Sequence, residues 1–192
     1  TITKSRNSDY QAIFALRGKI LNVQGKNRTE IYKNEELYNM MVAIGIEESI
    51  ENLRYGKVVI ATDADVDGFH IRILIMTYFF TYFEELIEQG RLYILETPLF
   101  RVRNKKENCY CYSEDERDEA IKKIKGAEVT RFKGLGEISP NEFKAFIGDD
   151  IRLVPVTYDS LAEIRREMEF YMGDNTPDRR DFIMENLLDG TS

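Results

Sequence analysis

Three aspartates stand at every second position of the chain, at Asp63, Asp65 and Asp67, and a glycine follows them. A calcium-binding EF-hand loop begins in this way, so a calcium site is the first hypothesis to test. The twelfth position of such a loop supplies a bidentate carboxylate. Counting from Asp63, that position is Leu74. Because a leucine cannot bind a cation, the sequence excludes an EF-hand.

The residues around the aspartates predict the elements that hold them. Residues 57–62 are a short β-branched run, typical of a buried strand. Residues 70–89 are long enough for a helix, and Gly90 is a good residue for its left-handed cap. Strand, acidic loop and helix form half of a βαβ unit. In open α/β sheets ligands bind beyond the carboxyl ends of the strands, so the loop is a candidate ligand site.

Three neighbouring carboxylates favour a divalent cation. In a nearly extended segment, side chains two residues apart lean toward the same side, so we expect the three carboxylates to face one another. A hard cation relieves their repulsion, and an all-oxygen ligand set favours Mg²⁺ over Zn²⁺. The alternative is a solvated acidic turn that caps the following helix, because aspartates stabilise a helix N-terminus.

The charge distribution adds a candidate nucleic-acid surface. The chain has a net charge of −7, but residues 1–33 contain seven Lys or Arg and only two carboxylates. A solvated face is the ordinary reading of such a segment, and charge alone does not exclude it. The cations that follow the acidic loop are His70 and Arg72.

Several stretches together resemble one enzyme family. The segment "DADVDG", followed by "HIR", resembles the acidic motif of the Toprim domain in type IIA DNA topoisomerases. Further stretches agree in order and spacing with the bacterial B subunit of gyrase or topoisomerase IV: "LRGKILNV" at 16–23, "ETPLFRV" at 96–102, "RFKGLGE" at 131–137 and "YMGDNTPDRRDFI" at 171–183. The resemblance covers nearly the whole chain. It implies an α/β fold, a Toprim domain with a Rossmann-like parallel sheet flanked by helices, followed by a smaller α+β C-terminal region.

The resemblance implies roles for particular residues. Asp63 and Asp65 would bind Mg²⁺ directly. Asp67 would act through a water molecule or by contacting the residues that bind the ion. Lys19 and Asn22 match the family segment that approaches DNA beside the cleavage site. A Lys offers a mobile charge to phosphate, and an Asn offers both a donor and an acceptor.

Three more residues are candidates for phosphate contact by the same resemblance. His70 and Arg72 begin the helix after the acidic loop, and Lys133 lies in "RFKGLGE". For His70 a structural role is the alternative. Gly134 and Gly136 in that stretch allow a close backbone approach to the site or to a partner.

The resemblance also implies partners and cofactors outside this chain. The family cuts double-stranded DNA by transesterification, with a nucleophilic Tyr carried by the A subunit of an A2B2 heterotetramer. Mg²⁺, with Mn²⁺ able to replace it, serves the acidic site, and ATP binds in an N-terminal domain of the parent protein. The family's first catalytic carboxylate, a Glu in a Glu-Gly-Asp-Ser segment, is expected just upstream of Thr1. This stretch alone is therefore expected to be inactive.

Two other functions remain open. A different Toprim enzyme, a primase or a nuclease, would share the acidic loop, but it would not explain "GKILN" or "YMGDNTPDRRDFI". A non-catalytic, Mg²⁺-dependent module that binds DNA is the other alternative. The sequence does not distinguish gyrase from topoisomerase IV.

The resemblance also implies two domains, a Toprim domain at residues 1–100 and the C-terminal region of a topoisomerase B subunit at 101–192. The remaining patterns predict local elements. They indicate a helix over 34–52 with Asn34 as its N-cap, and a hairpin over 99–112. The other expected elements are strands at 91–96, 127–132 and 151–157, a charged helix over 114–125, and helices that begin at Ser139-Pro140, Asp159 and Thr176-Pro177.

Cysteine usage and hydropathy bear on the compartment. Cys109 and Cys111 have the spacing of neither a disulfide framework nor a zinc site, so two buried thiols are expected. Free thiols indicate a reducing cytoplasm, where a bacterial DNA-binding protein would associate with the nucleoid. No apolar run approaches the ~20 residues of a membrane span, and no signal peptide is visible.

Overall fold

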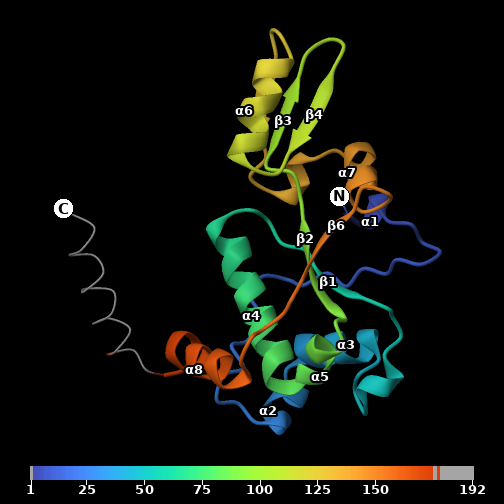
Figure 1. Ribbon diagram of the computed structural model, residues 1–192. Helices are drawn as coiled ribbons and strands as arrows, with labels where there is room; N and C mark the ends of the chain where they lie inside the picture. The colour runs from blue at the N-terminus through green and yellow to red at the C-terminus, as the bar shows by residue number, and fades with distance from the viewer. Residues whose placement is uncertain (1, 175–176, 178–192) are drawn as a thin grey trace.

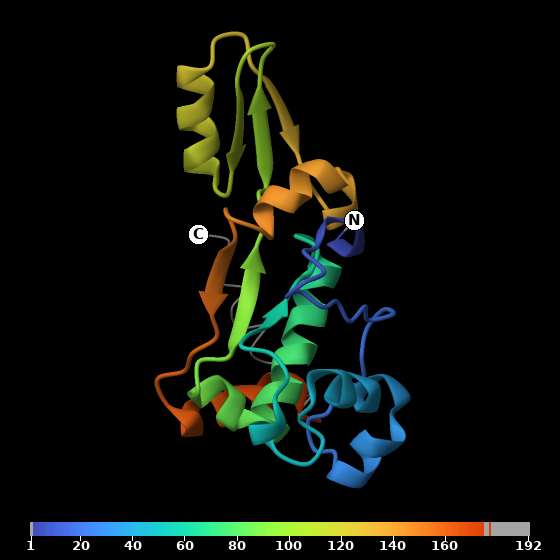
Figure 2. The same cartoon turned by 90° about the vertical axis from the view of Figure 1, so that its right-hand side faces the viewer.

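The computed structural model describes residues 2–174 and 177, and these form an elongated molecule (Figure 1). A helical body lies at one end, and a sheet with one covering helix lies at the other (Figures 1 and 2). Strands β2 (Leu92–Glu96) and β6 (Arg152–Pro155) lie between the two ends.

The first sheet has the strand order β1-β2-β6. Strand β1 (Val58–Ile60) pairs with β2 in parallel, with Val59 opposite Tyr93. Helices α4 (Val66–Tyr82) and α5 (Glu84–Glu88) connect these two strands and so make the predicted βαβ crossover. Strand β6 returns from far along the chain and pairs antiparallel with β2.

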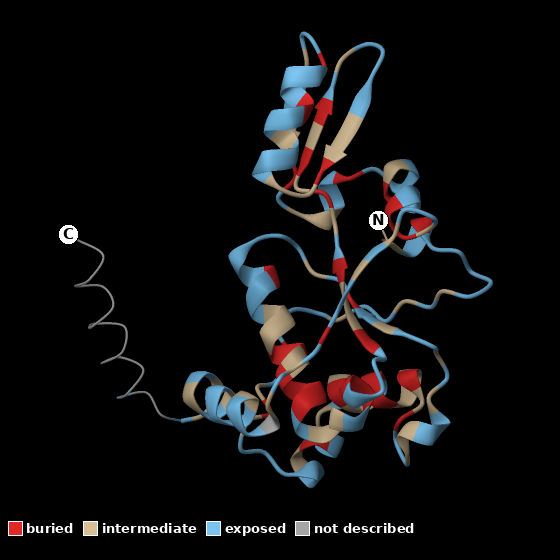
Figure 3. Ribbon diagram, in the orientation of Figure 1, coloured by how far each residue is buried: buried red, intermediate tan, exposed pale blue. Residues whose placement is uncertain are grey.

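The main hydrophobic core lies between this sheet and the helices around it (Figure 3). Helix α4 is its central element, because its second half is apolar on most sides and fully buries Tyr78 and Phe79. Helices α2 (Arg28–Lys33) and α3 (Glu35–Ile44) add apolar side chains from the N-terminal part. The last described helix, α8 (Leu161–Met172), packs on the same core.

The second sheet has the strand order β4-β3-β5 and is antiparallel throughout. Strands β3 (Phe100–Arg103) and β4 (Asn108–Cys111) form the predicted hairpin, and β5 (Glu128–Arg131) pairs with the other edge of β3. Helix α6 (Glu114–Lys123) covers one face of this sheet. The small core between them consists of Phe100, Val102, Cys111, Ala120 and Ile124.

Helix α7 (Pro140–Phe146) lies between the two ends of the molecule and begins with the predicted capping box. Ser139 Oγ accepts a hydrogen bond from the Glu142 backbone N–H, and the Glu142 carboxylate accepts one from the Ser139 backbone N–H. The short N-terminal helix α1 (Ile2–Ser5) packs against α7. The remaining elements are the 3₁₀ helices η1 (Ile50–Asn52) and η2 (Leu135–Glu137).

The helix expected over 34–52 has the predicted beginning but a different end. Asn34 is its N-cap, and its side chain accepts a hydrogen bond from Leu37 N. The helix stops at Ile44, because Gly45 adopts a left-handed φ of 85° and closes it. The prediction overlooked this glycine as a stop signal and so was too long.

The helix expected over 70–89 begins earlier and is interrupted. Asp65 is the N-cap of α4, and its Oδ1 accepts a hydrogen bond from Gly68 N at 2.7 Å. The chain leaves helical geometry at Phe83, so α4 and α5 are separate helices. Gly90 has the predicted left-handed φ, 64°, just after α5.

The predicted division at residue 100 remains a prediction, and the C-terminal part of the chain returns to the first sheet. Strand β6 pairs with β2, and α8 packs on the first core, although both elements come after residue 150. The helix expected from Thr176 lies outside the described residues. Among the residues that the structure describes, no helix has the length and apolarity to span a bilayer.

The two thiols lie side by side on β4, with their sulfur atoms 4.0 Å apart, and both are free. Cys111 is buried, but Cys109 is only partly buried. The prediction of two buried thiols is therefore correct for Cys111 and wrong for Cys109. Burial, followed by the neighbouring Cys109, raises the pKa of Cys111 to about 11. Cys111 is therefore an unreactive thiol at neutral pH.

Candidate metal and nucleic-acid site

The acidic loop joins the end of β1 to the start of α4, where the sequence predicts it. All three aspartates are exposed there. Gly68 is required by the fold of the loop, because a Cβ at this position would lie 2.1 Å from the Asp63 carbonyl oxygen. The glycine thus allows the first turn of α4 to pack directly on the residue that opens the acidic motif.

Asp63 is held by a segment 72 residues away in sequence. Its Oδ1 accepts a hydrogen bond from Leu135 N at 2.7 Å. Gly134 approaches so closely that an added Cβ would lie 3.2 Å from Asp63 Oδ1. This confirms the predicted close approach for Gly134, whereas a Cβ on Gly136 would have no neighbour within 4 Å.

Lys19 also reaches the acidic loop. Its Nζ lies 2.8 Å from Asp67 Oδ1, and the two side chains are 49% and 74% exposed. The hydrogen bond and the charge of Lys19 lower the pKa of Asp67, with a smaller contribution from His70. An ion pair this exposed contributes little to stability and exchanges partners readily, so Lys19 is available to another anion.

The three carboxylates do not share one side, which corrects the sequence-based prediction. Asp67 lies in the first turn of α4 and turns toward Lys19, whereas Asp63 and Asp65 precede the helix. The segment is not extended throughout, because Asp65 starts the helix. Within residues 2–174 and 177, no group of three or more His, Cys, Asp or Glu side chains could hold a metal ion. The alternative of a helix-capping turn is correct for Asp65, and a two-carboxylate site of Asp63 and Asp65 remains.

Arg72 and His70 occupy different surroundings on α4. The Nε and Nη2 atoms of Arg72 donate hydrogen bonds to Thr62 Oγ1, at 3.2 and 3.1 Å. Thr62 directly precedes Asp63, so Arg72 fixes the start of the acidic loop; the sequence analysis did not identify Thr62. His70 is exposed next to the loop, and its charge acts on Asp67.

Lys133 lies beside the loop, and Asn22 contacts the end of α8. Lys133 is exposed and precedes Gly134, and its backbone N–H donates to Glu137 at 2.8 Å. Asn22 donates its amide to the Met172 carbonyl at 2.7 Å. Its side-chain oxygen accepts from a backbone N–H two residues on, at 3.1 Å. Both ends of the Asn22 amide are therefore engaged within the chain, one by the last residue of α8 and the other by Gln24.

We call residues 133–137 the glycine-rich loop. A polar network that no sequence pattern indicated as a whole is centred on Glu142, which follows this loop in the chain. The Glu142 carboxylate accepts hydrogen bonds from Arg101 Nη1 at 2.6 Å, Tyr110 OH at 2.6 Å and Ser139 Oγ at 2.7 Å. Burial raises the Glu142 pKa, but the bonds from Ser139, Tyr110 and Arg101 outweigh it and bring the pKa to about 2. The capping box was the sequence signal for Ser139 and Glu142. Their partners lie on β3 and β4, so the network fastens the end of the loop to the second sheet.

The donor set at the loop fits a magnesium ion. Asp63 and Asp65 each use Oδ1 to accept from a backbone N–H, which leaves Oδ2 for a cation. Mg²⁺ is usually bound by one or two carboxylates together with water and substrate phosphates, so two carboxylates on an exposed loop suit it. Lys19, with its mobile ammonium, suits a phosphate that shares the ion.

Comparison with family models matches two parts of the chain. Residues 1–97 match the Toprim domain, and residues 124–184 match the carboxyl terminus of the DNA gyrase B subunit. The first match includes Lys19 and the acidic loop, and the second includes the glycine-rich loop.

Individual relatives are similar over nearly the whole chain. The B subunit of DNA topoisomerase 4 from Borreliella burgdorferi is 68% identical over 180 residues, which cover 93% of this chain and 30% of that protein. The B subunit of DNA gyrase from Thermotoga maritima is 39% identical over 195 residues, covering 96% of this chain and 30% of that protein. The chain thus spans about 30% of the length of these curated relatives.

A solved structure shares the fold. The DNA-binding, cleavage and re-ligation domain of topoisomerase II from Plasmodium falciparum superposes with a TM-score of 0.74. The match covers 87% of this chain and 24% of that chain at 23% sequence identity. This confirms the predicted fold, an α/β Toprim domain with a smaller α+β region after it.

Proposed function

Because this chain belongs to the Toprim domain family and continues into the carboxyl-terminal region of DNA gyrase B subunits, we propose that it is the DNA-cleavage and religation part of a type II topoisomerase B subunit. Its substrate is double-stranded DNA. Its partner is an A subunit that carries the nucleophilic Tyr, in an A2B2 assembly whose ATP site belongs to another domain of the parent protein. A DNA substrate and free thiols both fit a cytoplasmic location in a bacterium.

The observation that carries this proposal is the convergence of two distant segments on the acidic loop. Asp63 accepts a hydrogen bond from Leu135 N, and Asp67 pairs with Lys19. A carboxylate pair for a divalent cation and a lysine for a phosphate thus lie within one small surface. This combination is what phosphoryl-transfer chemistry on DNA requires.

Each side chain then has a definite task. Asp63 and Asp65 hold Mg²⁺, which when bound supplies positive charge to the phosphate and the leaving 3′ oxygen. Lys19 exchanges Asp67 for a DNA phosphate and so positions the backbone for attack by the partner's Tyr. Lys133 is exposed beside the loop and adds positive charge along the same backbone, and His70, also exposed there, can donate a hydrogen bond to a phosphate. Arg72 holds the loop through Thr62.

The observations favour a topoisomerase B subunit over the other candidate functions. A primase or nuclease of the Toprim family would share the acidic loop, but not a region like the carboxyl terminus of gyrase B. Between the two bacterial enzymes, the 68% identity to the B subunit of a topoisomerase 4, against 39% to the gyrase B of Thermotoga maritima, favours the topoisomerase IV type. A supercoiling assay of the full-length enzyme with its A subunit tests this choice, because introduction of negative supercoils would identify gyrase.

A cleavage assay tests the proposed function. Asp63→Asn, in the full-length B subunit together with its A subunit, is expected to abolish DNA cleavage and leave ATP hydrolysis largely intact. The asparagine keeps an oxygen for the Leu135 N–H and removes only the charge. Asp149→Asn, at an exposed aspartate of a different loop, is the matched control and should cleave normally. Normal cleavage by the Asp63 variant would contradict the proposed metal role.

A further inference from the structure

Figures 1 and 2 show that the turn between β3 and β4 is at the end of the second sheet farthest from α4. The sequence places four lysines in and near this turn. Lys105 and Lys106 lie in the turn of the β3–β4 hairpin, and Lys122 and Lys125 lie at and just after the end of α6. All four are exposed, and within the described residues none of them forms an ion pair. We call these four residues the basic tip.

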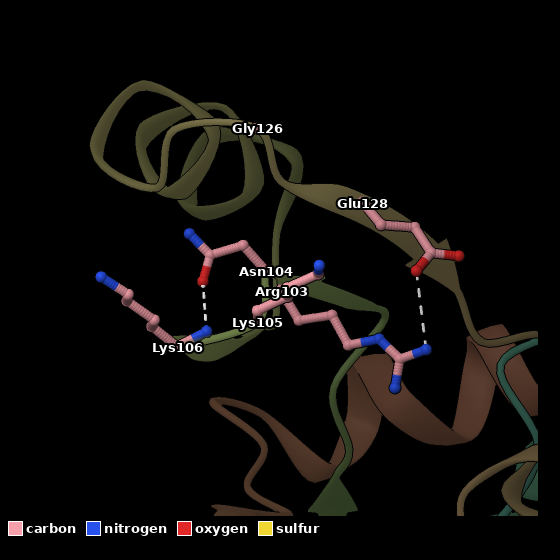
Figure 4. Close-up of a pocket in the computed structure, with 6 residues that line it drawn as sticks. All are labelled: Arg103, Asn104, Lys105, Lys106, Gly126 and Glu128. Carbon is pink, nitrogen blue, oxygen red and sulfur yellow. Dashed lines mark hydrogen bonds and ion pairs between the residues drawn. The ribbon is translucent and has the colours of Figure 1, made fainter.

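The basic tip is held together by a well-defined turn. Asn104 Oδ1 accepts from the backbone N–H groups of Lys106 and Glu107, each at 2.8 Å. Asn104 Nδ2 donates to the Lys125 carbonyl at 3.1 Å, which joins the hairpin to the turn after α6. Between them lies an open surface pocket, also lined by Arg103, Gly126 and Glu128 (Figure 4). The lysines therefore stand on a fixed framework, and two of them, Lys105 and Lys106, line the pocket.

The fold does not need all of these charges. Lysines in the last turn of α6 stabilise the helix by interacting with the negative end of its macrodipole, which accounts for Lys122. The hairpin turn needs only Asn104, because its hydrogen bonds involve the backbone of the next residues. Lys105 and Lys106 thus have no structural task within the described residues, in a chain whose net charge is −7. Unpaired cations gathered in an otherwise acidic protein are typical of a surface for a polyanion.

We propose that the basic tip is a second contact surface for duplex DNA, which binds backbone phosphates without a metal ion. This inference rests on the proposed function, since that function makes duplex DNA the available polyanion. The contact is independent of base sequence, because lysines on a hairpin turn meet phosphates as point charges. It adds affinity and takes no part in the cleavage step.

The path of the chain brings the basic tip within reach of a duplex at the acidic loop. Strand β5 starts beside the tip at Glu128 and leads to Lys133, next to the glycine that touches Asp63. Five residues of nearly extended chain span about 17 Å at roughly 3.3 Å per residue. This length corresponds to about five base pairs, since each strand of B-DNA carries a phosphate every ~3.4 Å along the axis.

A salt titration tests the inference. The probe is a fluorescently labelled duplex of about 30 base pairs, with binding followed by anisotropy in EDTA over a range of salt concentrations. The variant carries Lys105→Gln, Lys106→Gln, Lys122→Gln and Lys125→Gln. Each lost phosphate contact lowers the slope of log affinity against log salt by roughly 0.9, so we expect a decrease of about 3 to 4. Thermal unfolding should be unchanged, because exposed lysines contribute little to the fold.

A matched control carries the same change of net charge elsewhere. It has glutamine at four exposed cations outside residues 1–33 that form no ion pair within the described residues: Lys57, Arg91, Lys144 and Arg166. We expect this control to keep nearly the wild-type slope. Equal decreases in both variants would overturn the inference, because they would reflect net charge alone.

Two further measurements complete the test. The first tells a DNA surface from a protein-binding surface, and the second tells a failure of this inference from a failure of the proposed function. If the basic-tip variant loses binding to poly-glutamate but keeps its affinity for the duplex, the occupant is an acidic protein segment and the inference fails. Mn²⁺ binding at the acidic loop is measured on the same preparations. A wild-type protein that binds no Mn²⁺, together with a reduced slope in the variant, would refute the proposed function and support the basic tip as a DNA surface.

Discussion

Replacing Glu142 by Gln tests how the second sheet supports the glycine-rich loop. Glu142 receives hydrogen bonds from Arg101, Tyr110 and Ser139, and its side chain is 23% exposed. Arg101 is 16% exposed and has a buried Nε without a hydrogen-bond partner in the described part of the chain. The variant would therefore leave a largely buried guanidinium without its counter-charge, which is costly in a protein interior.

The magnitude follows from the pKa of Glu142. The carboxyl has a pKa of about 2 in the fold, against an ordinary value of 4.5. With about 1.4 kcal/mol for each pH unit between these values, and a discount for partial exposure, the ionised carboxylate stabilises the fold by about 2–3 kcal/mol. Because the folded-state pKa is the lower one, this stability is fully present above pH 4.5. It is lost as the pH falls through about 2.

Urea unfolding of wild type and Glu142→Gln at a series of pH values between 7 and 2 measures this difference. The curves should differ by about 2–3 kcal/mol at pH 7 and converge toward pH 2. Glu128→Gln is the matched control, since Glu128 pairs with Arg103 on the neighbouring strand at 3.5 Å but is 70% exposed. It should cost less than about 1 kcal/mol. A Glu142→Gln difference that is equal to the control, or constant with pH, would refute the reasoning.

Two other predictions concern the acidic loop. Lys19→Ala should lower the salt slope of DNA binding by the assembled two-subunit enzyme by roughly 0.9 without changing its melting temperature. Lys57→Ala, at an exposed lysine outside the basic segment 1–33, should leave the slope unchanged. An unchanged slope for Lys19→Ala would make Lys19 an ordinary surface charge. Gly134→Ala should weaken Mn²⁺ binding in a calorimetric titration by roughly 10–100-fold. The reason is that its Cβ would press on the Asp63 carboxylate at 3.2 Å, whereas Gly136→Ala has no such neighbour and should bind normally. Equal affinities in the two glycine variants would show that the contact with Asp63 does not matter.

Local signals in the sequence predicted much of the fold. The hairpin, the capping box of α7 and the N-cap at Asn34 are each set by residues a few positions apart. The errors have local causes as well, since Gly45 ends one helix and Asp65 starts another where the periodicity alone indicated neither. The pairing of β6 with β2 joins segments far apart in sequence, so no local pattern could indicate it.

The site was predicted in part for the same reason. The acidic loop follows from its strand and helix, but the turn of Asp67 toward Lys19 depends on a contact between residues far apart in sequence. The hydrogen bond from Leu135 N to Asp63 also joins residues 72 positions apart in sequence. For Asn22, the resemblance implied a contact with DNA, which stays a prediction. The structure shows a contact that no local pattern indicated, from the Asn22 amide to the Met172 carbonyl at the end of α8.

The central claim is that Asp63 and Asp65 bind a divalent cation, and a Mn²⁺ titration followed by paramagnetic relaxation of water tests it most directly. The comparison is between wild type, Asp63→Asn with Asp65→Asn, and a control in which Asp149 and Asp150, two exposed neighbours in another loop, become asparagine. Asparagine keeps the oxygen that accepts from Leu135 N and also serves as an N-cap, so the loop should keep its shape. We predict at least a tenfold loss of Mn²⁺ affinity in the loop variant only. The analogy is the ~10–100-fold loss of metal affinity on mutation of residues that hydrogen-bond to metal ligands. Equal affinities in all three proteins would contradict the account.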